Sequence, residues 1–188
     1  MLLRGLACGS RAMADLDLLV RARERARAEA VLLSLGYRRT ASTASDFAKP
    51  GARWCVDLHP GLWHAREEAL WREVRRARGA FKTLSLEAMA VHCAAHSVLN
   101  SGCLGERARG DLRVILRAPG FDWARLCSHA REIGLEALTA AALRALARDG
   151  ESVPPRVEAR LLRGPGRRVL ALLFAAGCKP PWNAARTT

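Results

Sequence analysis

Asp15 and Asp17 are the residues whose type and spacing best suit a chemical role, in the segment A-D-L-D-L-L-V at residues 14–20. Alternate side chains of a β-strand project from the same face, so these carboxylates stand about 7 Å apart while Leu16 and Leu18 point toward the core. Neighbouring carboxylates repel one another, and a divalent cation removes that cost. Two Mg²⁺ ions about 4 Å apart can assist in-line phosphoryl transfer. The pair therefore predicts a metal site, against the simpler interpretation of solvated acids on an edge strand.

Asp57 and His59 stand on a second predicted strand, residues 53–59, which a Pro-Gly pair ends. Asp57 lies between two apolar residues, and His59 points to the same face as Asp57. If the two strands are neighbours, Asp57 joins Asp15 and Asp17 as a third carboxylate of the metal site. His59 then reaches substrate, or it is a buried ring with a structural role, and the sequence leaves both interpretations open.

A glycine turn that could hold phosphates precedes the aspartate pair. The residues between Gly5 and Asp15 leave room for a turn whose backbone N–H groups bind a triphosphate. Arg4 and Arg11 lie on either side of that turn, where guanidinium groups can pair with phosphate. We therefore expect Arg4, Gly5, Arg11 and His59 to contact a nucleotide.

The order of these features resembles a known family. A glycine turn, a strand with Asp-hydrophobic-Asp and a later strand with a third acid are the pattern of the DNA polymerase β-like nucleotidyltransferase superfamily. More narrowly, residues 2–150 resemble a bacterial family known only as uncharacterised nucleotidyltransferases. The resemblance rests on L-R-G at 3–5, R-A-M-A-D-L-D-L-L-V at 11–20, L-G-Y at 35–37, V-D-L-H at 56–59 and the segment 84–116.

The resemblance implies roles for these residues and a reaction. Asp15, Asp17 and Asp57 would bind two Mg²⁺ ions, with Mn²⁺ as the alternative, and Asp57 would also deprotonate the acceptor. Gly5 would contact the phosphates of an NTP substrate. The chain is shorter than the family pattern before Gly5 and between Gly5 and Asp15. We therefore expect the front of the domain to be truncated.

The elements that must position these residues form a mixed α/β unit. A helix is predicted over 22–35, with Ala26, Ala30, Val31 and Leu35 on its apolar stripe and Gly36 as its C-terminal cap. An extended segment begins at residue 37, and residues 49–52 form a turn before the second strand. The first third of the chain is predicted to be a small mixed sheet with a helix.

Consecutive helices are predicted in the rest of the chain, with no further strands. Their expected ranges are 67–78, 86–99, 107–117, 122–133, 135–148, 155–163 and 167–176, and Asp122 is a predicted N-cap. The predicted fold class is α+β, a small mixed-sheet nucleotidyltransferase core followed by an all-helical domain. The expected domains are 1–65 and 66–177, with residues 178–188 as a flexible tail.

The composition narrows the class of protein further. Of 188 residues, 31 are Lys or Arg and 18 are Asp or Glu, which gives a net charge of +13, and half of the chain is hydrophobic. Because the arginines are dispersed among acids and many alanines, they indicate solvated helix faces, and we do not expect nucleic acid as a partner. We expect no membrane span, because arginines interrupt each apolar run. The six cysteines lack zinc-site spacing and indicate reduced thiols and a cytoplasmic protein.

His92 and His96 are four residues apart on one predicted helix, a spacing that can chelate a metal. The favoured interpretation is a pair of core histidines, with Asp111 facing one of them. This trio either supports the structure or forms part of an acceptor pocket.

These observations predict a nucleotidyltransferase that moves an NMP from an NTP to a hydroxyl group of an unknown acceptor. The acceptor could be a small molecule, a sugar, a peptide or a protein, and the same scaffold could serve as a toxin or a resistance factor. The alternative from another class is a non-catalytic, truncated relative that binds a protein or RNA through its basic helices.

Overall fold

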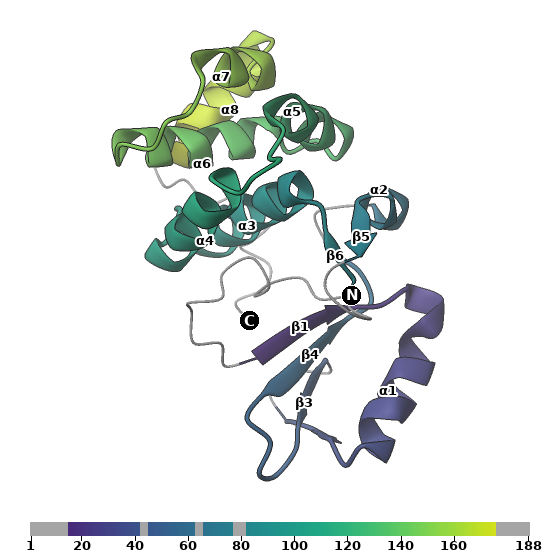
Figure 1. Ribbon diagram of the computed structural model, residues 1–188. Helices are drawn as coiled ribbons and strands as arrows, with labels where there is room; N and C mark the ends of the chain where they lie inside the picture. Colours follow the sequence, from purple (N-terminus) through teal and green to yellow (C-terminus); the bar gives the residue numbers. More distant parts are fainter. Residues whose placement is uncertain (1–14, 42–44, 63–65, 77–81, 176–188) are drawn as a thin grey trace. The chain divides into compact units, whose positions relative to one another are not determined.

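The computed structural model describes residues 15–41, 45–62, 66–76 and 82–175 (Figure 1). Packing divides the chain into two compact units, Met1–Ser85 and Leu86–Thr188. The predicted glycine turn and the predicted tail at 178–188 lie outside the described residues. The expected domain boundary after residue 65 stays a prediction.

A four-stranded mixed sheet forms the centre of the first unit, in the order β1-β4-β3-β2. The strands are β1 (Asp15–Leu19), β2 (Arg38–Arg39), β3 (Asp46–Ala48) and β4 (Cys55–His59). β1 and β4 are parallel, whereas the pairs β4–β3 and β3–β2 are antiparallel. This early sheet and the helices that follow it confirm the predicted α+β fold class.

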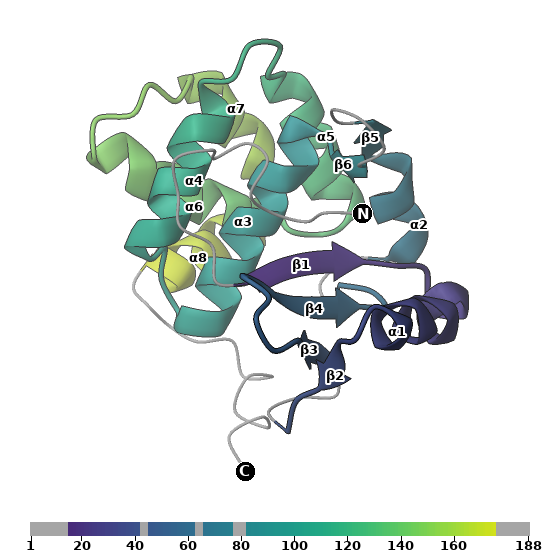
Figure 2. The same ribbon diagram turned by 60° about the horizontal axis from the view of Figure 1, so that its bottom comes forward.

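Helix α1 (Arg25–Ser34) follows a 3₁₀ turn, η1 (Ala22–Glu24), and covers one face of this sheet (Figure 2). Leu32 packs with Phe47, Val56 and Leu58, and Ala28 lies against the same cluster. The predicted apolar stripe of α1 is therefore wrong, because all four of its residues are exposed: Ala26, Ala30, Val31 and Leu35. Gly36 does end the helix, with φ of 83°, as predicted.

A short helix and a hairpin replace the predicted helix over 67–78. Helix α2 (Glu67–Arg72) ends where β5 (Val74–Arg76) begins, and β5 pairs antiparallel with β6 (Lys82–Leu84). Leu84 is buried opposite Val74, so pairing across the hairpin outweighs the local helical pattern. Ser85 follows β6 and donates its hydroxyl to the Glu73 carboxylate, with 2.6 Å between the oxygens.

The second unit is helical throughout its described part. Its core is α3, which packs against α4, α5 and α6, and α7 and α8 pack on α6. The predicted helices here are confirmed within two residues at each end: α3 (Leu86–Ser101), α4 (Glu106–Leu116), α5 (Trp123–Glu132), α6 (Glu136–Arg148), α7 (Pro155–Leu161) and α8 (Pro165–Ala175). The Asp122 carboxylate accepts hydrogen bonds from Ala124 N and Arg125 N, which confirms the N-cap of α5.

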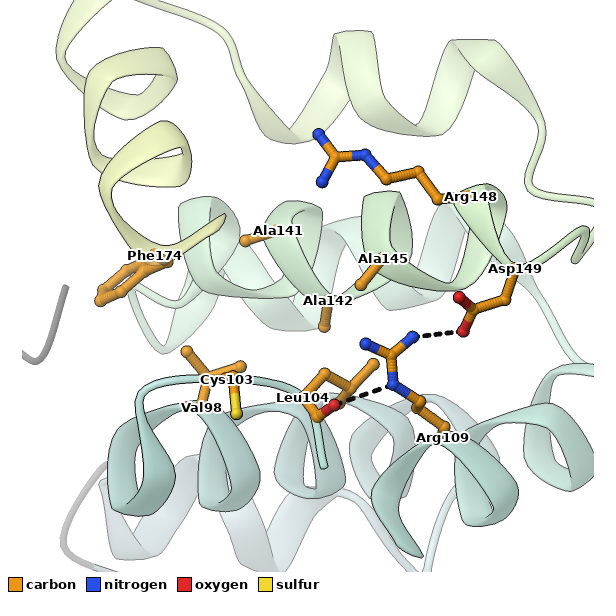
Figure 3. A pocket seen from close by; sticks show the side chains of 10 residues that line it. All are labelled: Val98, Cys103, Leu104, Arg109, Ala141, Ala142, Ala145, Arg148, Asp149 and Phe174. Atoms are coloured by element: carbon orange, nitrogen blue, oxygen red, sulfur yellow. Dashed lines mark hydrogen bonds and ion pairs between the residues drawn. The ribbon is translucent and has the colours of Figure 1, made fainter. Parts of the chain in front are cut away.

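A small cavity of about 150 Å³ lies among α3, α6 and α8 of this unit (Figure 3). Ala141 and Ala142 form part of its wall, and Phe174 lies at one side. The Arg109 side chain at its edge donates to the Leu104 carbonyl and pairs with the Asp149 carboxylate. This cation is therefore already neutralised.

The described cysteines are free thiols, of which Cys55 and Cys103 are exposed. Cys93 and Cys127 are buried in the helical unit, and burial raises the pKa of the Cys127 thiol. They act as apolar core residues, as predicted. No helix in the described ranges has the length and apolar character needed to cross a membrane.

Candidate functional site

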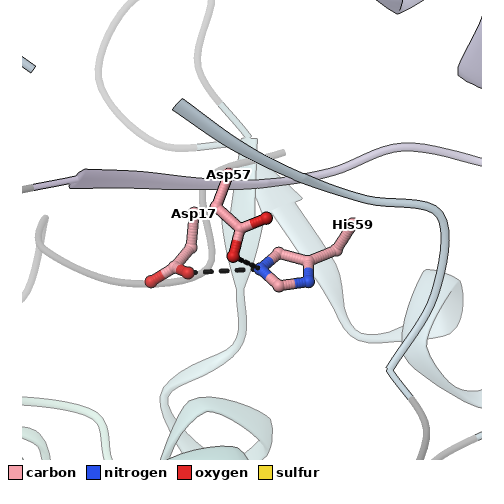
Figure 4. Close-up of side chains that lie close together, drawn as sticks. All are labelled: Asp17, Asp57 and His59. Atoms are coloured by element: carbon pink, nitrogen blue, oxygen red, sulfur yellow. Dashed lines mark hydrogen bonds and ion pairs between the residues drawn. The ribbon is translucent and has the colours of Figure 1, made fainter. Parts of the chain in front are cut away.

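Asp17, Asp57 and His59 come together on the first unit's sheet (Figure 4). His59 Nε2 lies 3.2 Å from Asp17 Oδ1 and 3.1 Å from Asp57 Oδ2. One ligand atom from each of the three residues can be chosen so that all lie within 4.8 Å of one another. Two carboxylates and an imidazole thus converge on a single point.

Strand register produces this cluster. Asp17 is the Cα partner of Asp57 across the parallel pair β1–β4, and Leu19 is the partner of His59. Because side chains alternate along a strand, Asp17, Asp57 and His59 share one face, and the intervening Leu16, Leu18, Val56 and Leu58 belong to the α1 side. The sheet therefore has an apolar face covered by a helix and an opposite face that carries the polar cluster.

The cluster fits a divalent cation. Its side chains are 14%, 25% and 28% exposed for Asp17, Asp57 and His59, so each is shielded yet reachable. Oδ1 of Asp57 is buried and forms no hydrogen bond within the described ranges. Buried carboxylate oxygens are costly without a partner. Carboxylate oxygen and imidazole nitrogen are both ligands for divalent metals.

Asp15 and Asp46 lie on either side of this cluster. Asp15 begins β1, is exposed and is the Cα partner of Cys55. It stands two residues before Asp17, on the same face of the strand, and is not one of the group of three. Asp46 on β3 is the Cα partner of Asp57, which places both on the same face of the antiparallel pair. Asp46 could not be recognised from the sequence as a site residue, because a three-residue strand shows almost no alternation.

The other predicted residues fall outside the described part of the chain or in the helical unit. Arg4, Gly5 and Arg11 lie outside the described residues, so their contacts with a nucleotide stay a prediction. His92 and Asp111 are buried in the helical unit, and the rings of His92 and His96 lie 5.9 Å apart. The described residues place these three in no metal-binding group.

A cavity of about 530 Å³ opens in the same unit as the Asp-Asp-His cluster. It begins at the end of β1, where Leu19 and Val20 form part of its wall, and continues over α2 and the β5–β6 hairpin. Val20 N donates a 2.9 Å hydrogen bond to the carbonyl of His59. The cavity and the cluster therefore adjoin through neighbouring residues of β1 and β4.

A mixed sheet that gathers two carboxylates and an imidazole, with a cavity beside them, defines a candidate metal-binding site. A family model described as uncharacterised nucleotidyltransferase matches residues 7–148, which is most of the chain, and the chain belongs to this family. The predicted family is thereby confirmed, while bacterial origin and a truncated front of the domain stay predictions. Neither a curated protein nor a solved structure matches the chain.

Proposed function

We propose that this protein transfers a nucleoside monophosphate from an NTP to a hydroxyl group of an acceptor, with divalent metal held by Asp17 and Asp57. One observation carries the proposal: two carboxylates of a nucleotidyltransferase family member face each other across β1 and β4. In that reaction the acceptor oxygen forms a bond to the α-phosphorus, and the bond from that phosphorus to the oxygen bridging to the β-phosphate breaks. Pyrophosphate leaves.

Each residue of the cluster has a role in this proposal. Asp17 and Asp57 supply carboxylate oxygens to the metal, and His59 supplies Nε2 as the third ligand. A metal held by these residues would supply positive charge to offset the phosphate charge. Asp57 also takes the proton of the acceptor hydroxyl. Asp15 binds a second ion, because it projects from β1 on the same side as Asp17.

The proposal is tested by calorimetric titration of each NTP with Mg²⁺ or Mn²⁺. The unaltered chain should bind NTP only when metal is present, and Asp17→Asn and Asp57→Asn should abolish that binding, because an amide does not replace a carboxylate ligand. Glu106→Gln is the matched control: Glu106 is 90% exposed on α4 and its loss of charge should change nothing. Circular dichroism confirms that each variant folds. Binding that is equal in all variants would contradict the metal site.

A further inference from the structure

The cavity beside the cluster is strongly basic. Arg21, Arg75, Arg76 and Lys82 line it, and Glu24 is its one acidic lining residue in the described ranges. The rest of the wall is largely apolar and includes Leu19 and Trp71. Its volume of about 530 Å³ lies within the range typical of small-molecule pockets. The helical cavity of about 150 Å³ is too small for the same purpose.

Arg76 and Lys82 are the observation that points to a ligand. They are direct Cα partners across the antiparallel β5–β6 pair, so two positive side chains stand side by side. Like charges directly opposite each other destabilise a β-ladder. Within the described ranges neither side chain forms an ion pair, and both line the cavity. An anion in the cavity would remove their repulsion.

The other two cations are held in place at the cavity wall. The Arg21 guanidinium carbon lies 4.6 Å from the centroid of the Trp71 ring, which orients it. Arg75 donates from Nη1 to the carbonyls of Arg72 and Val74 at 2.8 and 2.9 Å. Arginine in a fixed orientation suits phosphate, because its N–H groups match two phosphate oxygens at once. Each of these two arginines also lies near an acid: Arg21 Nη1 is 3.9 Å from Glu67 Oε1, and Arg75 Nη2 is 3.8 Å from Glu73 Oε2. Arg76 and Lys82 are therefore the cations that an anion would pair with, beside an apolar and aromatic wall.

We propose that this cavity binds the acceptor, and that the acceptor is a small organic phosphate monoester that carries a hydroxyl group. The inference rests on the proposed function for its reaction and on the cavity for its substrate class. The phosphate would lie between Arg76 and Lys82, and the organic part would lie against Trp71 and Leu19. Because Leu19 is the register partner of His59, a hydroxyl at that end of the ligand lies nearest the metal cluster.

The test uses phenyl phosphate as the probe, with benzyl alcohol as its uncharged counterpart, titrated calorimetrically in EDTA. The unaltered chain should bind phenyl phosphate and not benzyl alcohol. The double variant Arg76→Gln/Lys82→Gln should weaken that binding by at least about tenfold, because two charge-assisted contacts are lost. The double variant should still fold. Because the like-charge pair is removed, its midpoint of thermal unfolding, measured without the probe, should equal or exceed that of the unaltered chain.

Two control variants isolate the cavity. Arg27→Gln/Arg38→Gln removes two exposed charges from the same unit outside the cavity and should keep phenyl phosphate binding unchanged. Asp17→Asn/Asp57→Asn should lose NTP binding and keep phenyl phosphate binding, so failure of the proposed function and failure of this inference are separate results.

Three results would overturn the inference. The first is that the folded chain does not bind phenyl phosphate. The second is that Arg76→Gln/Lys82→Gln and the control pair weaken phenyl phosphate binding equally. The third is that saturating Mg-ATP displaces phenyl phosphate. The last result would assign the cavity to the phosphates of the NTP. Binding of phenyl phosphate that persists with Mg-ATP present would support the acceptor assignment.

Discussion

His59 distinguishes this cluster from a purely carboxylate metal site. Its Nε2 is the atom that lies close to both Asp17 and Asp57, so the same nitrogen is placed to share a cation with them. Mg²⁺ favours oxygen ligands almost exclusively, whereas imidazole nitrogen suits later first-row metals such as Fe²⁺ and Zn²⁺ best, and Mn²⁺ accepts it more readily than Mg²⁺ does. A site with one imidazole should therefore bind Mn²⁺ more tightly than Mg²⁺.

The variant His59→Gln tests this preference. We expect its Mn²⁺ affinity to fall by about tenfold or more, since even outer-shell changes cost that much at metal sites, while its Mg²⁺ affinity changes less. Electron paramagnetic resonance of free Mn²⁺, without nucleotide, measures the loss, and competition by Mg²⁺ gives the second affinity. His96→Gln makes the same replacement on α3, outside the cluster. Equal Mn²⁺ affinity in His59→Gln and His96→Gln would show that His59 is not a ligand.

Side-chain alternation explains how much of the cluster could be predicted. Asp17 and Asp57 each stand between apolar residues, so the sequence indicated that their carboxylates leave the core together. The same two-residue alternation predicted that the His59 side chain lies on the same face of its strand as Asp57. Which acids are opposite each other depends on strand register, and register is a property of pairing rather than of either strand. The sequence therefore could not show that Asp17, and not Asp15, pairs with Asp57, or that Asp46 lies beside them.

Helix α1 is joined to the sheet by an ion-pair network as well as by its apolar contacts. Glu29 accepts a hydrogen bond from Arg25 Nε at 2.7 Å, and its other carboxylate oxygen pairs with Arg39 on β2. The hydrogen bond from Arg25, followed by the charge of Arg39, lowers the pKa of Glu29. The carboxylate thus favours the folded state when it is ionised.

Because the pKa of Glu29 is lowered in the folded state, the direction in which its contribution to stability changes with pH is fixed. Above the unfolded-state pKa of Glu, about 4.3, the contribution of Glu29 is fully present, and it is lost as the pH falls through the lower folded-state pKa. Glu29→Gln should therefore be less stable than the unaltered chain at pH 7 and nearly equal to it at an acidic pH below the folded-state pKa of Glu29. Urea unfolding at both pH values measures the difference. A difference of the same size at both would contradict the role of the charge.

Two elements show where local patterns failed. The sequence of α1 is rich in Ala and Arg, so several stripes were equally plausible, and contact with Phe47 and Val56 selected the face of Leu32. The residues of β5 follow α2 with only Glu73 between them, and their charges fitted a solvated helix face. They became a strand because β6 supplies the hydrogen bonds of the hairpin. The longer helices of the second unit were predictable, because each ends at glycine, proline or a capping residue.

The net charge of +13 is distributed over the whole molecule in a way that weakens the nucleic-acid alternative. In the helical unit many arginines pair with acids. Arg113 lies 3.0 Å and Arg117 2.7 Å from Glu151 Oε1, and Arg144 lies 2.5 Å from Glu158. Paired guanidinium groups are less available to a phosphate backbone. The charge of these helices is therefore partly neutralised, whereas Arg76 and Lys82 at the cavity form no ion pair within the described ranges.

Binding of RNA and DNA should consequently be weak, independent of sequence and sensitive to salt. We expect fluorescence anisotropy of labelled 20-nucleotide strands to give dissociation constants no tighter than the non-specific range, about 10⁻⁴ to 10⁻⁶ M, near physiological salt. Going from about 50 to 200 mM salt should weaken binding steeply, because each phosphate contact releases a counterion. Asp17→Asn/Asp57→Asn should bind equally or slightly better, since only negative charge is removed. Sequence-selective binding that is tighter than this range and persists at about 200 mM salt would instead favour a non-catalytic RNA-binding relative, because base contacts, unlike phosphate contacts, are insensitive to salt.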